Sequence, residues 1–223
     1  MASRYKHLEK SLGTETLKKI QDKTVTIIGL GGVGSCCAEL FTRSGVGVRI
    51  IEKGRVEETD MDRLSLFTEK DIGKFKATEA KKILNAINSE AKVKSFNEEI
   101  TKESLFLAEG DLVLDCSGND IVNRLVEKFC AEKKIPLIYG QVRDTKAIII
   151  TMQGPSCSVT ATLEHIPHEP VDSIWTPAID LAAAVMVSKS YRILKGEKIK
   201  EEAIVYDLKT HTITHPTVRK AKK

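Results

Sequence analysis

The chain has 223 residues, of which 41% are hydrophobic and 30% charged, a balance typical of a folded globular protein and not of a disordered or fibrous one. Its 35 Lys and Arg against 31 Asp and Glu leave a net charge of only +4, which argues against a nucleic-acid partner, since such proteins concentrate basic residues on one face. The longest apolar runs, near 148–150 and 181–187, are too short to cross a membrane, and residues 1–6 lack a signal-peptide core, so we expect a cytoplasmic protein.

The first half is predicted to build a strand–helix–strand unit. In sequence order it contains polar helical residues 1–22, a strand at 24–28, a helix at 35–44, a strand at 48–52, an acidic loop at 57–63 and a helix at 74–88. The first strand is β-branched at nearly every position, as in a strand buried on both faces.

The second half continues the alternation. It is predicted to contain strands at 93–96 and 112–115, a helix at 121–133, strands at 137–139 and 145–152, a long loop at 154–176, a helix at 178–194 and a closing hairpin of 204–208 with 212–214. This order predicts an α/β fold: a Rossmann-like, mainly parallel sheet with helices on both faces and a C-terminal antiparallel extension. We expect one domain over residues 1–223.

A glycine-rich turn joins the first strand to the helix that follows it. Gly29, Gly31 and Gly34 have the spacing G-x-G-x-x-G, and the acidic Glu52 ends the second strand. In such a turn the first glycine permits a tight bend, the second lets backbone amides approach a phosphate, and the third packs helix against strand. The helix N-terminus attracts the anion, and Glu52 can accept hydrogen bonds from ribose hydroxyls. The motif predicts a nucleotide site and by itself suggests NAD.

Further motifs change that interpretation. They are Arg4-Tyr5, Gly29 to Gly34, Asp60-Met61-Asp62-Arg63, Asp71 to Lys76, Asp115-Cys116-Ser117-Gly118-Asn119 and Val205-Tyr206-Asp207. Their types and order, over essentially the whole sequence, resemble the ThiF/MoeB/HesA family of ubiquitin-activating-like adenylyltransferases. The resemblance implies binding of ATP with Mg²⁺, adenylation of a carboxylate with release of pyrophosphate, and a homodimer.

The resemblance also assigns roles to single residues. Arg63 and Lys76 match the family's phosphate-binding cations and are the predicted catalytic residues. The predicted nucleotide-binding set is Gly29, Gly31, Gly32, Gly34, Glu52, Asp60, Arg63 and Lys76. Fixed cations suit this chemistry, because a carboxylate that attacks the α-phosphorus brings two anions together.

The sequence departs from the family pattern at several positions. Asp60 replaces the usual asparagine, and Gly118 replaces the aspartate that holds magnesium, so Mg²⁺ would have to be held by Asp120 or by the phosphates themselves. Arg4-Tyr5-Lys6-His7 replaces Arg-Tyr-x-Arg, whose second arginine reaches the partner's ATP, so His7, Lys6 or Arg4 would have to take over that role.

The residues that would bind zinc or form a thioester also differ. The family's paired C-x-x-C zinc motifs are absent, since Thr160 stands where the partner of Cys157 would be, so we expect no zinc. A thiolate at Cys157 would need a cation such as His165 or His168 beside it, and a small core residue is the favoured interpretation. Adjacent Cys36 and Cys37 are interpreted as small buried side chains of a helix.

The acceptor carboxylate stays open. The C-terminal glycine of a ubiquitin-like sulfur carrier is the usual acceptor in the family. A small acid is favoured by the missing zinc and thiol machinery, as in the member that activates a pyridinol carboxylate for the guanylylpyridinol cofactor of iron hydrogenase. Two alternatives remain: a catalytically silent nucleotide-binding scaffold, suggested by Gly118 and His7, and an NAD-dependent oxidoreductase, suggested by the glycine loop and Glu52.

Overall fold

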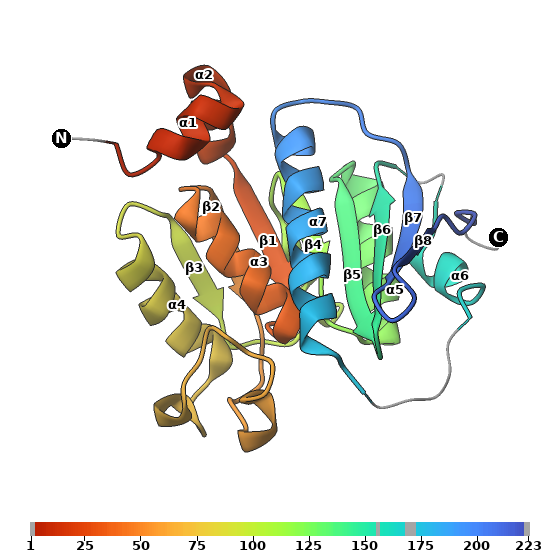
Figure 1. Ribbon diagram of the computed structural model, residues 1–223, viewed down its shortest axis with the longest axis horizontal. Helices are drawn as coiled ribbons and strands as arrows, with labels where there is room; N and C mark the ends of the chain where they lie inside the picture. Colours follow the sequence, from red (N-terminus) through yellow and green to blue (C-terminus); the bar gives the residue numbers. More distant parts are fainter. Residues whose placement is uncertain (1–2, 155–156, 168–172, 221–223) are drawn as a thin grey trace.

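The computed structural model describes residues 3–154, 157–167 and 173–220. Its described part is built on an eight-stranded sheet with the order β3-β2-β1-β4-β5-β6-β7-β8 (Figure 1). The strands are β1 Thr24–Ile28, β2 Gly47–Ile51, β3 Val93–Phe96, β4 Leu112–Asp115, β5 Leu137–Arg143, β6 Lys146–Met152, β7 Glu202–Asp207 and β8 Thr212–Thr214. The predicted α/β class with an antiparallel C-terminal extension is confirmed.

Strands β3, β2, β1 and β4 run parallel to one another, and we call them the parallel half. Both faces of this half are covered, which is why β1 and β4 read as nearly continuous apolar runs. Because the strand order turns back at β1, with β2 on one side and β4 on the other, the carboxyl ends of β1 and β4 flank a crevice where α/β proteins bind their ligands.

Strand β5 pairs in parallel with β4 but antiparallel with β6, and β6, β7 and β8 continue antiparallel. We call β5 to β8 the antiparallel half. The last paired residues of β4 and β5 are Asp115 and Tyr139, so β5 runs on past the end of β4 as far as Arg143. Four residues of extended backbone add roughly 13 Å beyond the parallel edge.

Helices cover both faces of the sheet. They are α1 Lys6–Leu12, α2 Thr14–Gln21, α3 Gly32–Arg43, α4 Lys76–Ile87, α5 Asp120–Lys133, α6 Val159–Leu163 and α7 Thr176–Leu194. Buried side chains of α3, α4 and α7 share one apolar core with the sheet, and those of α5 and α6 share the other (Figure 1). None of the described helices is long and apolar enough to cross a membrane.

Two predicted elements differ from the structure for local reasons. The N-terminal helical segment is divided at Gly13, whose φ of +83° interrupts the helix. Strand β5 is four residues longer than predicted and runs through Gly140. A glycine interrupts the strand pattern in the sequence, but in the fold a Cβ at this position would lie only 2.0 Å from the Met186 sulfur of α7.

The prediction of a loop over 154–176 was wrong in part. It contains α6, which begins at Ser158, whose hydroxyl accepts a hydrogen bond from the Ala161 amide. Five residues with one cap give too little periodicity to stand out beside the nearby prolines. Residues 155–156 and 168–172 of that prediction, His168 among them, lie outside the described residues.

Candidate functional site: a nucleotide crevice at the ends of β1 and β4

The glycine turn lies at the carboxyl end of β1, directly before α3. Gly29 has a φ of +85°, and a Cβ there would lie 2.7 Å from the Cys116 carbonyl oxygen, so only glycine fits. Gly34 is equally constrained, since its Cβ would lie 2.0 Å from the Gly29 carbonyl oxygen. A Cβ on Gly31, in contrast, would meet nothing within 4 Å. The second glycine is therefore the one that faces open space, where a ligand would lie.

The N-terminus of α3 is open to an anion. Gly31 is its N-cap residue, and this end of the helix has no side-chain cap. The first amides of any helix have no partner within the helix, and together with the helix dipole they form a ready site for phosphate. Gly32, predicted to bind the nucleotide, is the first residue of α3. A Cβ on Gly32 would lie 2.5 Å from the Ile179 side chain, which presses α7 against this turn.

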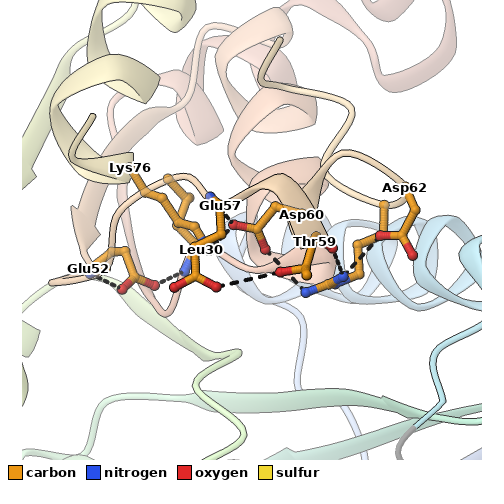
Figure 2. A network of polar contacts seen from close by, with 9 residues as sticks. Leu30, Glu52, Glu57, Thr59, Asp60, Asp62 and Lys76 are labelled. Atoms are coloured by element: carbon orange, nitrogen blue, oxygen red, sulfur yellow. Dashed lines mark hydrogen bonds and ion pairs between the residues drawn. The ribbon is translucent and has the colours of Figure 1, made fainter. Parts of the chain in front are cut away.

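Glu52 lies directly after β2 and holds two loops. Its Oε2 accepts a hydrogen bond from the Leu30 amide at 2.8 Å, and its Oε1 accepts one from the Gly54 amide at 2.6 Å (Figure 2). The residue predicted to contact ribose therefore also fixes the shape of the glycine turn. A carboxylate oxygen has lone pairs for more than one donor, so these bonds leave acceptor capacity for a ribose hydroxyl.

Three predicted site residues form one ion-pair cluster (Figure 2). The Asp60 side chain is only 5% exposed, and its Oδ2 lies 2.8 Å from the Lys76 Nζ. Its Oδ1 accepts a hydrogen bond from the Arg63 Nη2 at 3.1 Å. The Glu57 amide also donates to Oδ2 at 3.0 Å. The two cations predicted to bind phosphate are thus held together by the carboxylate that lies between them.

Arg63 has two further partners: its Nη1 donates to the Thr59 carbonyl and, at 2.9 Å, to Asp62. With the side chain one quarter exposed, the guanidinium lies between the buried Asp60 and solvent. Lys76 begins α4, and its side chain is 13% exposed. Both cations are therefore held by bonds to neighbouring residues and are partly open to solvent.

A cleft of about 420 Å³ opens beside the glycine turn. Its lining residues come from the ends of β1 and β2, from the segment after β3 and from the start of α5. They are Ile28, Gly29, Ile51, Glu52, Lys53, Glu98, Glu99, Ile100, Ser117, Asn119 and Val122. Much of this volume is open to solvent: the enclosed space is about 120 Å³, below the roughly 300–1,000 Å³ of typical ligand pockets. Glu52 on its wall suits a nucleoside sugar.

The loop after β4 closes the other side of the crevice. Asp115 is fully buried, and burial raises the pKa of its carboxyl to about 6, although hydrogen bonds from the Ser117 amide and hydroxyl oppose the shift. Asn123 donates to the second carboxylate oxygen at 2.9 Å in the amide orientation that satisfies its neighbours. Asp120 begins α5 and is exposed. Of the two acids, Asp120 is the one left open to a metal ion.

The sequence analysis missed a polar row on β5. Tyr139, Gln141 and Arg143 alternate along the strand and so share the face that α5 covers. The Gln141 Oε1 accepts hydrogen bonds from the Tyr139 hydroxyl at 2.5 Å and from the Arg143 Nε at 3.0 Å. Arg143 lies just beyond the predicted strand 137–139, and the polar alternation Tyr-x-Gln-x-Arg was the available signal.

A family model described as ThiF family matches residues 5–223. The chain belongs to the ThiF family. Among curated relatives it is 27% identical over 93% of its length to the sulfur carrier protein ThiS adenylyltransferase of Bacillus subtilis, covering 66% of that protein. It is 31% identical over 65% of its length to the sulfur carrier protein adenylyltransferase of Thermus thermophilus, covering 55%. The sequence thus spans less than two thirds of the length of these relatives.

A solved structure supports the fold. The crystal structure of Escherichia coli MccB with ATP superposes with a TM-score of 0.84 over 99% of this protein and 72% of that one, at 19% identity. At this identity the match shows a ThiF-family fold and no more.

The cysteines and histidines show no catalytic thiol setting among the described residues. Cys157 is buried, and burial raises its pKa to about 12. The His165 Nδ1 lies 2.9 Å from the Ala161 carbonyl oxygen. Cys37 is fully buried as predicted, whereas Cys36 is partly exposed. In the described part of the sequence no group of three or more His, Cys, Asp or Glu is placed to hold a metal.

At the N-terminus, Arg4 forms an ion pair with Glu90 at 3.2 Å and a hydrogen bond with Asn88. His7 lies exposed on α1. Of the residues considered for the missing family arginine, Arg4 therefore already has partners in this chain, whereas His7 is exposed.

Proposed function

We propose that this protein uses ATP with Mg²⁺ to adenylate a carboxylate, forming an acyl-adenylate and releasing pyrophosphate. The observation that carries the proposal is the cluster of Arg63, Lys76 and Asp60 beside the open helix N-terminus at Gly31. Backbone amides and two cations at one crevice suit a polyphosphate, and the family membership supports the same chemistry.

In this proposal different groups of the protein have different roles. The α3 amides and Lys76 hold the phosphates, Arg63 offsets charge that develops as the α-phosphorus is attacked, and Glu52 holds the sugar. Magnesium in nucleotide sites takes one or two carboxylates besides phosphate oxygens and water, so Asp120 suffices as its protein ligand. When bound, the ion would neutralise charge on the phosphates of the leaving group.

The acceptor is a small carboxylic acid, such as a pyridinol carboxylate, or the C-terminal glycine of a ubiquitin-like sulfur carrier. Relatives are named for the second kind. We propose that the enzyme works as a homodimer, as its family resemblance implies, with residues 1–223 as one adenylation domain. His7 or Lys6 then replaces the missing arginine.

Exchange of labelled pyrophosphate into ATP tests the proposal. The purified protein is incubated with ATP, Mg²⁺ and either a sulfur carrier ending in Gly-Gly or a hydroxypyridine carboxylic acid. We expect exchange only when an acceptable acid is present, and a loss of about 10²- to 10³-fold in Arg63→Ala. Tight ATP binding without exchange for any acid would instead favour the silent scaffold.

A second measurement addresses the remaining alternative. Equilibrium binding of ATP and of NAD to the same preparation should favour ATP, because Arg63 and Lys76 offer cations to a triphosphate. A preference for NAD would contradict the proposal and support an oxidoreductase.

A further inference from the structure

The end of β5 carries a partly buried cation whose bonding is incomplete. The Arg143 Nε donates to Gln141, but its Nη1 is buried and has no hydrogen-bond partner among the described residues. A buried donor without a partner is costly, and an unpaired guanidinium nitrogen more so than a neutral one. A carbonyl, carboxylate or water oxygen on Nη1 would complete this site.

Register places Arg143 beyond the parallel edge. Asp115 of β4 pairs with Tyr139, and Arg143 lies four residues further along the same strand. The row it belongs to borders the loop after β4, because a Cβ on Gly118 would lie 3.4 Å from the Gln141 amide nitrogen. Position 118 has no side chain, and even a Cβ there would touch Gln141, so the loop after β4 and the polar row lie in close contact.

A backbone strap links the end of β5 to the phosphate-binding cations. The Asp144 amide donates to the Ser173 carbonyl at 2.8 Å, and the Trp175 amide donates to the Asp144 carbonyl at 3.1 Å. Directly after Trp175, the Thr176 hydroxyl donates to the Asp62 carbonyl at 3.2 Å. Because Asp62 directly precedes Arg63, the short strap of residues 173–176 connects the segment that carries Arg143 with the segment that carries Arg63.

The surrounding charges define what Arg143 can bind. The carboxylates of Asp115 and Asp120 act on the nearby Tyr139 hydroxyl and raise its pKa, in addition to the larger effect of burial, whereas the Arg143 charge lowers it. An isolated anion would be repelled by the two acids. The Arg143 guanidinium, with its planar pair of donors, offsets that repulsion and can accept a carboxylate.

We infer that Arg143, supported by Gln141, forms the subsite that binds the carboxylate of the acceptor beside the nucleotide. The inference rests on the proposed adenylation and names the part of the crevice that the acceptor uses. A carboxylate oxygen on Nη1 completes the bonding of the guanidinium and places the nucleophile on the strand that borders the β4 loop. Either the carboxyl terminus of a carrier protein or a small aromatic acid supplies this group.

The test uses acetate as the smallest carboxylate probe. The full-length protein is saturated with α,β-methylene-ATP, which cannot be cleaved at the reacting bond, and binding of ¹³C-carboxyl acetate is followed by NMR line broadening. Acetamide, which lacks the charge, is the ligand control. We expect acetate but not acetamide to bind the unmodified protein.

Substitutions then assign the binding to Arg143. In Arg143→Met acetate binding should weaken about tenfold or more, with the affinity for α,β-methylene-ATP unchanged. Arg143→Lys, which keeps the charge in a folded protein, should give an intermediate loss. Arg124→Met on the exposed side of α5 is the matched control and should bind acetate normally. Equal acetate binding in Arg143→Met and in the unmodified protein would overturn the inference. It would also be overturned if the unmodified protein did not bind acetate at all.

Two competing ligands distinguish a carboxylate of a carrier protein from that of a small molecule. N-acetyl-Gly-Gly represents a carrier C-terminus, and a hydroxypyridine carboxylic acid represents a small aromatic substrate. The better competitor against acetate identifies the source, and its binding should also weaken in Arg143→Met. If acetate binds through Arg143 while no pyrophosphate exchange occurs with any acid, the subsite stands and the adenylation proposal fails. If exchange occurs and Arg143→Met leaves it unchanged, the adenylation proposal stands and the subsite fails.

Discussion

The parallel and antiparallel halves of the sheet contribute different kinds of groups to one crevice. The parallel half offers the open helix N-terminus at Gly31 together with the side chains of Glu52, Arg63 and Lys76, which are held by other residues of that half. The antiparallel half offers side chains on the extension of β5, where Arg143 has a buried nitrogen without a partner among the described residues. Phosphates are common to every nucleotide, whereas acceptors differ. The proposed phosphate site and the proposed acceptor subsite therefore lie on different halves of the sheet, so substitutions can test them separately.

The largest expected effect concerns the phosphate side. Lys76→Met should reduce pyrophosphate exchange by about 10²- to 10³-fold, because a fixed cation beside the reacting phosphates is lost. Lys74→Met is the matched control, since Lys74 lies two residues earlier and forms ion pairs with Asp71 and Glu79 away from the Asp60 cluster. Its exchange rate should stay within about twofold of the unmodified protein. If both variants lose activity alike, the parallel half is not where the phosphates are held.

A second effect concerns the pH dependence of stability that the Asp115 carboxyl causes at the end of β4. Folding raises the pKa of Asp115 from 3.8 to about 6, so the folded state binds more protons than the unfolded state between those values. Stability therefore falls as pH rises through this window, by about 3 kcal/mol in total. Asp115→Asn keeps an acceptor for Ser117 and removes the titration.

Denaturant unfolding at pH 4 and pH 7 checks this prediction as a difference between the two proteins. The unmodified protein should lose about 2 kcal/mol more than Asp115→Asn across that interval, because the unfolded carboxyl is already partly ionised at pH 4. Equal slopes would show that Asp115 is not the buried acid that the loop after β4 holds. The variant should also be the more stable of the two at pH 7.

The glycines of the turn should separate folding from binding. Gly29→Ala forces a φ of +85° on a residue with a Cβ and a contact of 2.7 Å with Cys116, so we expect a loss of about 2 kcal/mol or more and a drop in Tm. Gly31→Ala should fold normally because its Cβ meets no atom within 4 Å. It should nevertheless weaken binding of α,β-methylene-ATP about tenfold, since the Cβ enters the space of the phosphates. Calorimetry of unfolding and of binding measures both; a Gly31→Ala protein that binds normally would place the phosphates elsewhere.

The difference between local signals and long-range contacts explains how much of the fold and of the site the sequence could predict. Glycine spacing and buried strand composition are local signals, so β1, the turn after it and Glu52 were found in place. The bonds among Asp60, Arg63 and Lys76 join residues up to sixteen positions apart, and only the fold shows that one carboxylate takes both cations. Arg143 was missed because its importance depends on how far β5 extends beyond β4, which is a property of strand pairing and not of any motif.

The smallest expected effect concerns Asp60 itself, the acid that stands where the family has asparagine. Its carboxylate neutralises part of the charge that Arg63 and Lys76 offer to a phosphate. Asp60→Asn keeps an oxygen for the Glu57 amide and removes one negative charge, so α,β-methylene-ATP should bind about three- to tenfold more tightly at low salt. The gain should shrink at high salt, where ions screen the difference.

Asp62→Asn is the control for that measurement, because Asp62 also pairs with Arg63 but its side chain is 72% exposed. Solvent already screens this carboxylate, so its removal should change the affinity by less than the Asp60 substitution. Weaker binding of α,β-methylene-ATP in Asp60→Asn would mean that the Asp60 carboxylate mainly holds the two cations in position. Its positioning of the cations would then matter more for affinity than the charge that it neutralises. The parallel half would then depend on side-chain placement as much as the antiparallel half does at Arg143.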